Sequence, residues 1–236
     1  MKPQNIEAIY GLSPLQEGIL FHALYDSDSA EYFEQFSFPL EGDLDVEAFE
    51  AAWQKVVARH PVLRTAFVWE GLEKPRQVVH RQVTLPFERL DWSDLDEDER
   101  GRRLKALLDE DRRQGFVLAR APLMRVILVR LGESRHQMVW SHHHLLLDGW
   151  SVSLVVGEVF ASYRAARLNL SLGLPPVRAY RDYIRFLDSR RRETSASARD
   201  VESFWRRLFE DWQPMDTGLA RPATSSSELS EEASHG

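Results

Sequence analysis

The chain has 236 residues, 43% of them hydrophobic and 28% charged, which is typical of a water-soluble globular protein. No apolar run approaches the length that crosses a bilayer, and no signal-peptide core follows the N-terminus, so the sequence disfavours membrane and secreted proteins. The formal net charge of −7 argues against a general nucleic-acid binder. The chain contains no cysteine, which fits the cytoplasm as the predicted location.

Two helices are predicted in the first sixty residues. Ser13 and Gln16 have the spacing of a capping box, which begins a helix that runs to about Leu24. Asp45 caps the second helix, and Pro61 marks its end. This second helix carries one apolar stripe, formed by Val46, Phe49, Ala52, Trp53, Val56 and Val57.

Extended segments follow the second helix. Strands are predicted over residues 63–69, 76–83 and 85–90 because β-branched and aromatic residues recur there between turn residues. Gly71 and Pro75 lie in the short loop between the first two strands. These two strands are therefore expected to form a hairpin.

A charged helix and a second strand pair occupy the middle of the chain. Residues 94–113 carry only a minority of apolar side chains, so an exposed amphipathic helix is expected there. Strands are predicted over residues 123–131 and 136–141. The segment Gly132-Glu133-Ser134 supplies the turn that joins them.

The junction after this strand pair carries residues suited to proton transfer. Residues 137–141 alternate polar and apolar side chains as a strand does, and helical spacing of apolar residues begins at Ser151. His143 and His144 therefore lie at the end of a strand, and Asp148 lies at the start of a helix. Imidazole is the side chain that exchanges protons near neutral pH, so the pattern predicts a proton-handling site.

Ordinary structural roles fit the same residues. A histidine beside a strand is commonly a core or surface residue, and Asp148 is suited to capping a helix. No metal is predicted, because strand geometry sends His142 and His144 to one face and His143 to the other. The chain also lacks cysteine and any HExxH spacing, which disfavours zinc.

The last third of the chain is predicted to be helical and then disordered. The helix from Ser151 extends to about Ala165, and two further helices are expected over residues 180–192 and 199–212, after a break rich in glycine and proline. Aromatic residues at helical spacing in the last two helices indicate packing faces. Arginines cluster near residues 178–192 and predict a solvated helix face. The small, polar and acidic residues toward the C-terminus predict a linker-like, disordered tail over residues 213–236.

Four segments resemble, in order and separation, the opening motifs of the condensation domain of nonribosomal peptide synthetases. They are Leu12 to His22, Arg59 to Phe67, Ser141 to Ser151, and Tyr180 to Tyr183. The third segment contains HHxxxDG, which chloramphenicol acetyltransferases share. The first segment is similar to the subtype that joins an L-configured donor to an L-amino acid.

The resemblance implies an α/β fold. Each of two lobes would have the chloramphenicol acetyltransferase fold, an α+β two-layer sandwich with a mixed, largely antiparallel sheet covered by helices. Residues 1–212 would form the N-terminal lobe. Carrier proteins would deliver their substrates on 4′-phosphopantetheine arms through a tunnel between the lobes, and no cofactor bound by the lobe itself is implied.

The resemblance also implies roles for the motif residues. The second His of the motif corresponds to His144, which would act in catalysis together with His143, Asp148 and Gly149. An α-ammonium must lose a proton in order to attack a thioester, and a neutral imidazole can accept that proton or orient the amine. The sequence leaves both roles of His144 open.

Three further residues are expected to support the site. In the family the motif aspartate pairs with an arginine, so Asp148 is expected to form a buried ion pair with Arg64. Trp150 and Ser151 follow the motif directly and would support it. Gly149 is expected where the backbone turns closely or leaves room for the pantetheine arm.

The resemblance covers about half of a full condensation domain, and the motifs of the second lobe are absent. The chain is therefore expected to be cut from a longer synthetase, or translated from a truncated gene, and to be inactive alone. Its expected partners are the missing C-terminal lobe and the donor and acceptor carrier proteins, with no nucleic acid and no membrane.

Two other functions remain open on the sequence alone. A free-standing trimeric acetyltransferase would share the histidine motif, although that motif lies near the chain's end in those enzymes. A non-catalytic module for docking carrier proteins would share the fold. In that case self-association through the exposed lobe interface is expected.

Overall fold

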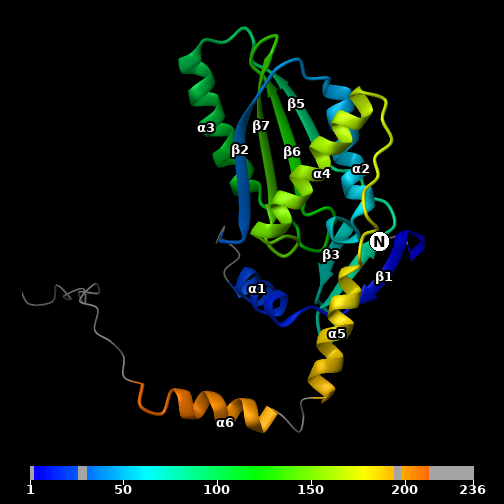
Figure 1. The fold of residues 1–236 in the computed structure, drawn as a ribbon. Coiled ribbons are helices and arrows are strands. Elements are labelled where there is room, and N and C mark those ends of the chain that lie inside the picture. Colours follow the sequence, from blue (N-terminus) through cyan, green and yellow to red (C-terminus); the bar gives the residue numbers. More distant parts are fainter. Residues whose placement is uncertain (1–2, 26–30, 194–197, 213–236) are drawn as a thin grey trace, which may run out of the picture. The chain divides into compact units, whose positions relative to one another are not determined.

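The computed structural model describes residues 3–25, 31–193 and 198–212 of the chain (Figure 1). The chain divides into two compact units, residues 1–189 and 190–236. All the strands in the described residues belong to the first unit. The predicted tail, residues 213–236, lies outside the described residues.

The larger of two sheets carries the strand that leads to the histidines. Its strands are, in spatial order, β2 (Phe33–Glu41), β7 (Arg135–His143), β6 (Met124–Arg130) and β5 (Phe87–Asp91). The β5–β6 pair is parallel and the other two pairs are antiparallel. The sheet is therefore mixed and largely antiparallel, as predicted.

The smaller sheet has three antiparallel strands. Its order is β1 (Ile6–Tyr10), β4 (Arg76–His80) and β3 (Thr65–Val68). The predicted hairpin between β3 and β4 is confirmed. The extended segment 63–69 is shorter than predicted, because Pro61–Arg64 forms a turn of 3-10 helix before β3.

The helices agree with the predicted ranges to within a few residues. They are α1 (Pro14–Tyr25), α2 (Val46–Arg59), α3 (Glu97–Gln114), α4 (Gly149–Arg167), α5 (Tyr180–Glu193) and α6 (Ala198–Leu208), with a further 3-10 turn at Pro3–Asn5. The capping box is present, since the Ser13 Oγ accepts from the Gln16 N–H and the Gln16 Oε1 accepts from the Ser13 N–H. The Asp45 Oδ1 accepts from the Ala48 N–H and caps α2.

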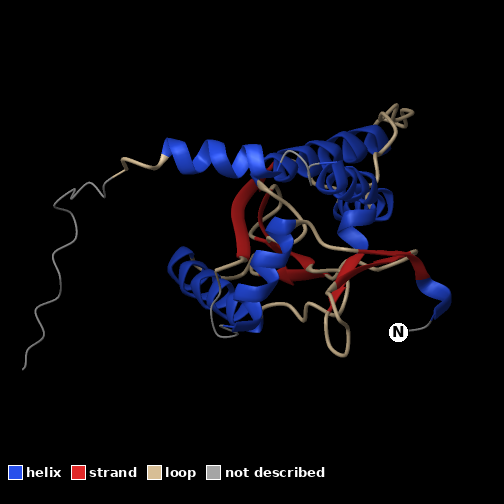
Figure 2. Ribbon diagram, turned by 90° about the horizontal axis from the view of Figure 1, so that it is seen from below, coloured by secondary structure: helices blue, strands red, loops and turns tan. Residues whose placement is uncertain are grey.

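Helices pack on both faces of the larger sheet (Figure 2). Along β6, Val126 and Leu128 pack into the core with α2 and α4, whereas Ile127 and Val129 pack against the leucines of α3. A strand that is apolar at consecutive positions must be covered on both sides. The predicted α/β class is confirmed, and α3 adds a third layer to the predicted two-layer arrangement.

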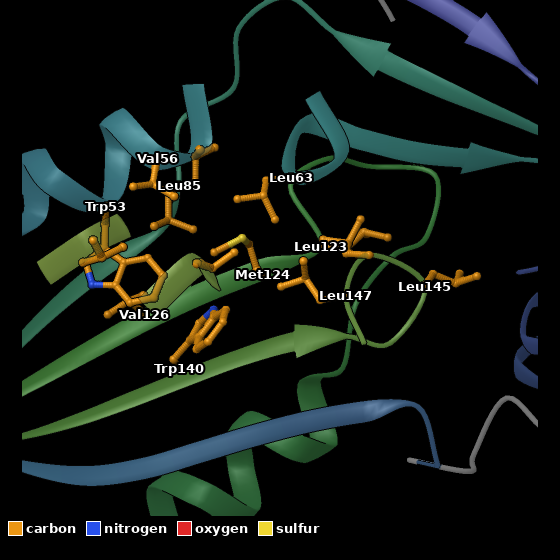
Figure 3. Close-up of a cluster of buried hydrophobic side chains, with 14 of the residues drawn as sticks. Trp53, Val56, Leu63, Leu85, Leu123, Met124, Val126, Trp140, Leu145 and Leu147 are labelled. Carbon is orange, nitrogen blue, oxygen red and sulfur yellow. The ribbon is translucent and has the colours of Figure 1, made fainter. Parts of the chain in front are cut away.

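The main core lies between the larger sheet and α2 with α4. Trp53 of α2 and Trp140 of β7 are fully buried, with their ring centroids 5.1 Å apart (Figure 3). Leu145 and Leu147, from the segment after β7, extend this core. The core therefore anchors the segment that follows β7 and carries His144.

Two strands were missed in the sequence. Neither β1 nor β2 was predicted, although Phe36, Phe38 and Leu40 alternate with other side chains along β2. β2 pairs with β7 over its whole length, from Phe33 opposite His143 to Glu41 opposite Arg135.

No helix in the described residues has the length and apolar character needed to cross a membrane.

Candidate functional site

The histidine segment connects β7 to α4. β7 ends at His143, a turn carries His144 to Leu147, and α4 begins at Gly149. The His144 N–H donates to the Tyr32 carbonyl at 2.8 Å, which joins the turn to the residue before β2. The predicted strand-to-helix junction is confirmed.

His142 and His143 are buried behind this turn. The His142 ring lies 5.0 Å from Trp140 and 5.9 Å from Phe36, between centroids. The His143 Nδ1 accepts a hydrogen bond from the Leu145 N–H at 3.1 Å. Burial lowers the pKa of each ring to about 4, so both rings are neutral at physiological pH. The hydrogen bond from the Leu145 N–H to His143 therefore stabilises the conformation of the turn.

His144 has a different environment from its two neighbours. Its side chain is 36% exposed, and its Nδ1 lies 3.5 Å from the Glu34 Oε1 on β2. The His144 side chain also lines a pocket, described below. Of the three adjacent histidines, His144 is therefore the one that a substrate can reach.

Asp148 caps α4. Its Oδ1 accepts from the Ser151 N–H at 2.8 Å and from the Ser151 Oγ–H at 2.6 Å. These bonds, the side-chain bond first, lower the pKa of Asp148 below its ordinary value. The predicted ordinary role of Asp148 as an N-cap is confirmed, and Ser151 is its partner.

The predicted ion pair between Arg64 and Asp148 is wrong for this structure. The Arg64 Nη1 bonds the Glu7 Oε2 at 2.7 Å and also donates to the carbonyls of His80 and Arg81. The Arg64 side chain is only 6% exposed, whereas Asp148 lies at the surface. Arg64 therefore joins β1 to the end of β4, because Glu7 and those carbonyls surround its guanidinium.

Gly149 and Trp150 lie at the surface beside the turn. A Cβ on Gly149 would meet no atom within 4 Å, and the φ of Gly149 is outside the left-handed region. Neither observation requires glycine at this position, and the expected role of Gly149 stays a prediction. Trp150 is 86% exposed.

A pocket of about 290 Å³ opens beside His144. All four sequence motifs contribute to its lining: Ser13 and Gln16 from the first, His60 from the second, His144 and Asp148 from the third, and Tyr180 from the fourth. Most of its other lining residues are apolar, among them Leu15, Ile19, Leu147, Leu154 and Val177. Motifs that are far apart in the sequence therefore meet around one cavity.

Hydrogen bonds hold these motifs together. The Gln16 Nε2 donates to the Leu145 carbonyl at 3.1 Å, which connects α1 to the histidine turn. Ser13 and Tyr180 both line the pocket, and burial raises the pKa of Tyr180. The start of α1 and the start of α5 therefore both border the pocket.

Two polar groups near the site were missed by sequence reasoning. His60, in the pocket wall, has its Nε2 2.7 Å from the Glu158 Oε2 on α4. Glu34 lies beside His144; the alternating pattern of β2 could have indicated the strand but not its pairing with β7. Among the described residues, no group of three or more His, Asp or Glu side chains is arranged to hold a metal ion.

The arrangement of the sheet, the histidine turn and the pocket points to one protein family. A mixed sheet ends in an HHxxxDG turn, and that turn lines a pocket at the start of the following helix. The family model described as the condensation domain matches residues 6–234. The chain belongs to the condensation domain family.

Curated relatives of the chain are peptide synthetases. Over 98% of its length it is 44% identical to one subunit of the linear gramicidin synthase of Brevibacillus parabrevis, and over 87% it is 47% identical to another subunit of that synthase. It is 33% identical to surfactin synthase subunit 3 of Bacillus subtilis (strain 168) over 90% of its length. The chain spans only 4%, 3% and 16% of these relatives, respectively.

Solved structures share the fold. The starter condensation domain of rhizomide synthetase matches with a TM-score of 0.74 and 21% identity, covering 88% of this chain and 49% of that one. A cyclization-docking bidomain from Sorangium cellulosum matches with a TM-score of 0.73 and 25% identity, covering 91% and 42%. The chain thus spans about half the length of the condensation domain it matches.

Proposed function

We propose that the chain is the N-terminal half of a condensation domain that forms peptide bonds in a nonribosomal peptide synthetase. The observation that carries this proposal is the meeting of all four motifs around one pocket, with His144 in its wall. The free-standing acetyltransferase is not favoured, because the relatives are synthetases many times longer than this chain.

The reaction is an acyl transfer from sulfur to nitrogen. The amine of the acceptor aminoacyl thioester bonds to the carbonyl carbon of the donor thioester, and the donor carbon–sulfur bond breaks. The nitrogen loses a proton and the departing sulfur ends as a thiol, so the reaction balances without an oxidant or a metal. Holding both thioesters in one site supplies much of the acceleration.

His144 is the proposed catalytic residue. A half-exposed imidazole in the pocket wall can accept the proton of the attacking amine or orient that amine. His143 and Asp148 support it indirectly, because His143 shapes the turn and Asp148 begins α4. Arg64 supports the lobe rather than the site.

The substrates would arrive on 4′-phosphopantetheine arms of donor and acceptor carrier proteins. The apolar pocket wall would suit the acyl group carried by such an arm. We expect the second half of the domain to cover the exposed Leu15, Trp150 and Leu154. Covering them would exclude water from the pocket and complete the tunnel.

Substitution of His144 tests the proposal. In a complete condensation domain that contains this chain, His144→Ala should lower dipeptide formation by about a hundredfold or more, since general acid–base groups contribute that much. The measurement uses loaded donor and acceptor carriers, with the melting temperature followed in parallel. We expect the melting temperature to stay unchanged, because the His144 ring is half-exposed.

His80→Ala is the matched control. His80 is a half-buried histidine at the end of β4 and does not line the pocket. This variant should retain the wild-type rate of dipeptide formation. A His144→Ala domain that is as active as the His80→Ala domain would contradict the catalytic assignment and favour a docking module.

A further inference from the structure

Glu34 lies next to the proposed catalytic histidine although the two residues are far apart in the sequence. In the β2–β7 register Glu34 is opposite His142, two residues before His144. Its carboxylate reaches past the end of β7, so that the Glu34 Oε1 is 3.5 Å from the His144 Nδ1. The Glu34 side chain is 41% exposed and the His144 side chain 36% exposed.

The backbone holds this pair in place. The Tyr32 carbonyl accepts from the His144 N–H at 2.8 Å, so the turn is joined to the chain two residues before Glu34. The β2–β7 ladder continues directly from that bond, starting at Phe33. His144 therefore cannot move away from β2 unless this hydrogen bond breaks.

The other ionisable groups around His144 have other roles. His142 and His143 are neutral at physiological pH, because burial lowers their pKa to about 4. The His144 ring is the weakest of the groups that lower the pKa of Asp148, and the Asp148 Oδ1 holds Ser151. Among the described residues, the carboxylate within ion-pair distance of the His144 ring is that of Glu34.

We propose that Glu34 is a positioning residue for His144. Its carboxylate accepts the Nδ1–H of the neutral imidazole, which leaves the lone pair on Nε2 free to accept the proton of the attacking amine. The carboxylate also stabilises the imidazolium that forms when Nε2 takes that proton. The catalytic consequence rests on the proposed function, whereas the Glu34–His144 pair is a property of this chain alone.

The tautomer of His144 tests the pair directly. Nitrogen-15 NMR of the chain at neutral pH distinguishes protonated Nδ1 from protonated Nε2, and the signals of His144 are identified by their loss in His144→Gln. In the wild type we expect the proton on Nδ1. Glu34→Ala should move it to Nε2, and Glu34→Gln, which keeps an acceptor oxygen, should retain it on Nδ1.

Glu41→Ala is the matched control, since Glu41 is an exposed glutamate at the far end of the same strand. It should leave the His144 tautomer unchanged. An unchanged tautomer in a folded Glu34→Ala chain overturns the proposal. If the Glu34→Ala chain does not fold, the wild type provides the test. A neutral His144 ring with its proton on Nε2 in the wild type would also overturn the proposal.

Activity separates this proposal from the proposed function. In the complete domain Glu34→Ala should lower kcat about tenfold to a hundredfold with little change in KM, because only the orientation of the base is lost. Suppose that Glu34→Ala changes the tautomer of His144 but a His144→Ala domain is fully active. The Glu34–His144 pair would then be supported, and the catalytic role of His144 would be refuted. An unchanged kcat in a Glu34→Ala domain, with His144→Ala inactive, would overturn the positioning role.

Discussion

Three consecutive histidines in this chain have three different environments. His142 packs among aromatic rings, and its Nε2 has no hydrogen-bond partner within the described residues. His143 accepts a backbone hydrogen bond and shapes the turn. His144 lies half-exposed in the pocket wall. At the scale of single residues, burial separates the two structural rings from the proposed catalytic one.

The buried rings make the stability of the fold depend on pH. Their folded-state pKa of about 4 lies below that of an unfolded histidine, so between pH 6.5 and 4 the unfolded chain binds protons that the folded chain does not. The free energy of unfolding therefore falls as the pH falls through this window. Each ring contributes up to about 3 kcal/mol to that fall.

His142→Phe should weaken this pH dependence. Phenylalanine keeps the contacts with Trp140 and Phe36 but cannot bind a proton in the unfolded state. The loss of stability between pH 7 and 4.5 should therefore be smaller by about 2 kcal/mol than in the wild type. Urea unfolding at the two pH values measures it.

His22→Phe serves as the control for this measurement, because His22 is exposed on α1. It should show the pH dependence of the wild type. If His142→Phe and the wild type lost stability equally on acidification, the low pKa of His142 would be wrong.

At the scale of elements, a buried polar network docks α3 onto the larger sheet. The Asp111 carboxylate of α3 bonds Arg125 of β6, Ser141 of β7 and Gln35 of β2, so it contacts three adjacent strands. The Arg125 guanidinium also lies 4.5 Å from the centroid of the Phe116 ring. Asp111 is only 3% exposed, so this network is shielded from water.

Asp111→Ala should therefore be strongly destabilising. It leaves the Arg125 charge buried without its partner, which costs about 3 to 5 kcal/mol in comparable buried pairs. The free energy of unfolding from urea denaturation measures the effect. Glu110→Ala, which removes the neighbouring exposed pair with Arg113, should change it by only about 0.5 kcal/mol or less. Equal effects of the two substitutions would show that the network does not hold α3.

At the scale of the whole molecule, the pocket has an incomplete wall. Leu15 and Leu154 line the pocket and yet are 71% and 70% exposed. The solved condensation domain described above is matched over only 49% of its length. The pocket is therefore open to water on the side of Leu15 and Leu154.

The isolated chain is therefore expected to fold but to form no peptide bond. Loaded donor and acceptor carriers incubated with it should yield only the background hydrolysis seen without protein. A circular dichroism spectrum and a cooperative thermal transition would show that the chain is folded. Condensation by the isolated chain at the rate of a complete domain, abolished by His144→Ala, would show that one lobe suffices.

Local features of this protein are predictable from its amino-acid sequence. The capping box at Ser13, the cap at Asp45 and the β6–β7 hairpin were predictable because each depends on residues only a few positions apart. The motif order was sufficient to identify the family. The position of His144 directly after a strand also followed from local alternation.

The contacts between groups far apart in the sequence depend on the folding of the whole chain. Arg64 bonds Glu7 rather than Asp148, and Glu34 lies beside His144, because strand pairing brings together segments that no local pattern connects. The same holds for β1 and β2, which acquire their partners β4 and β7 only when the chain folds. A side chain's partner depends on the register of whole strands, and that register is set by burial of the complete sheet rather than by neighbours in sequence.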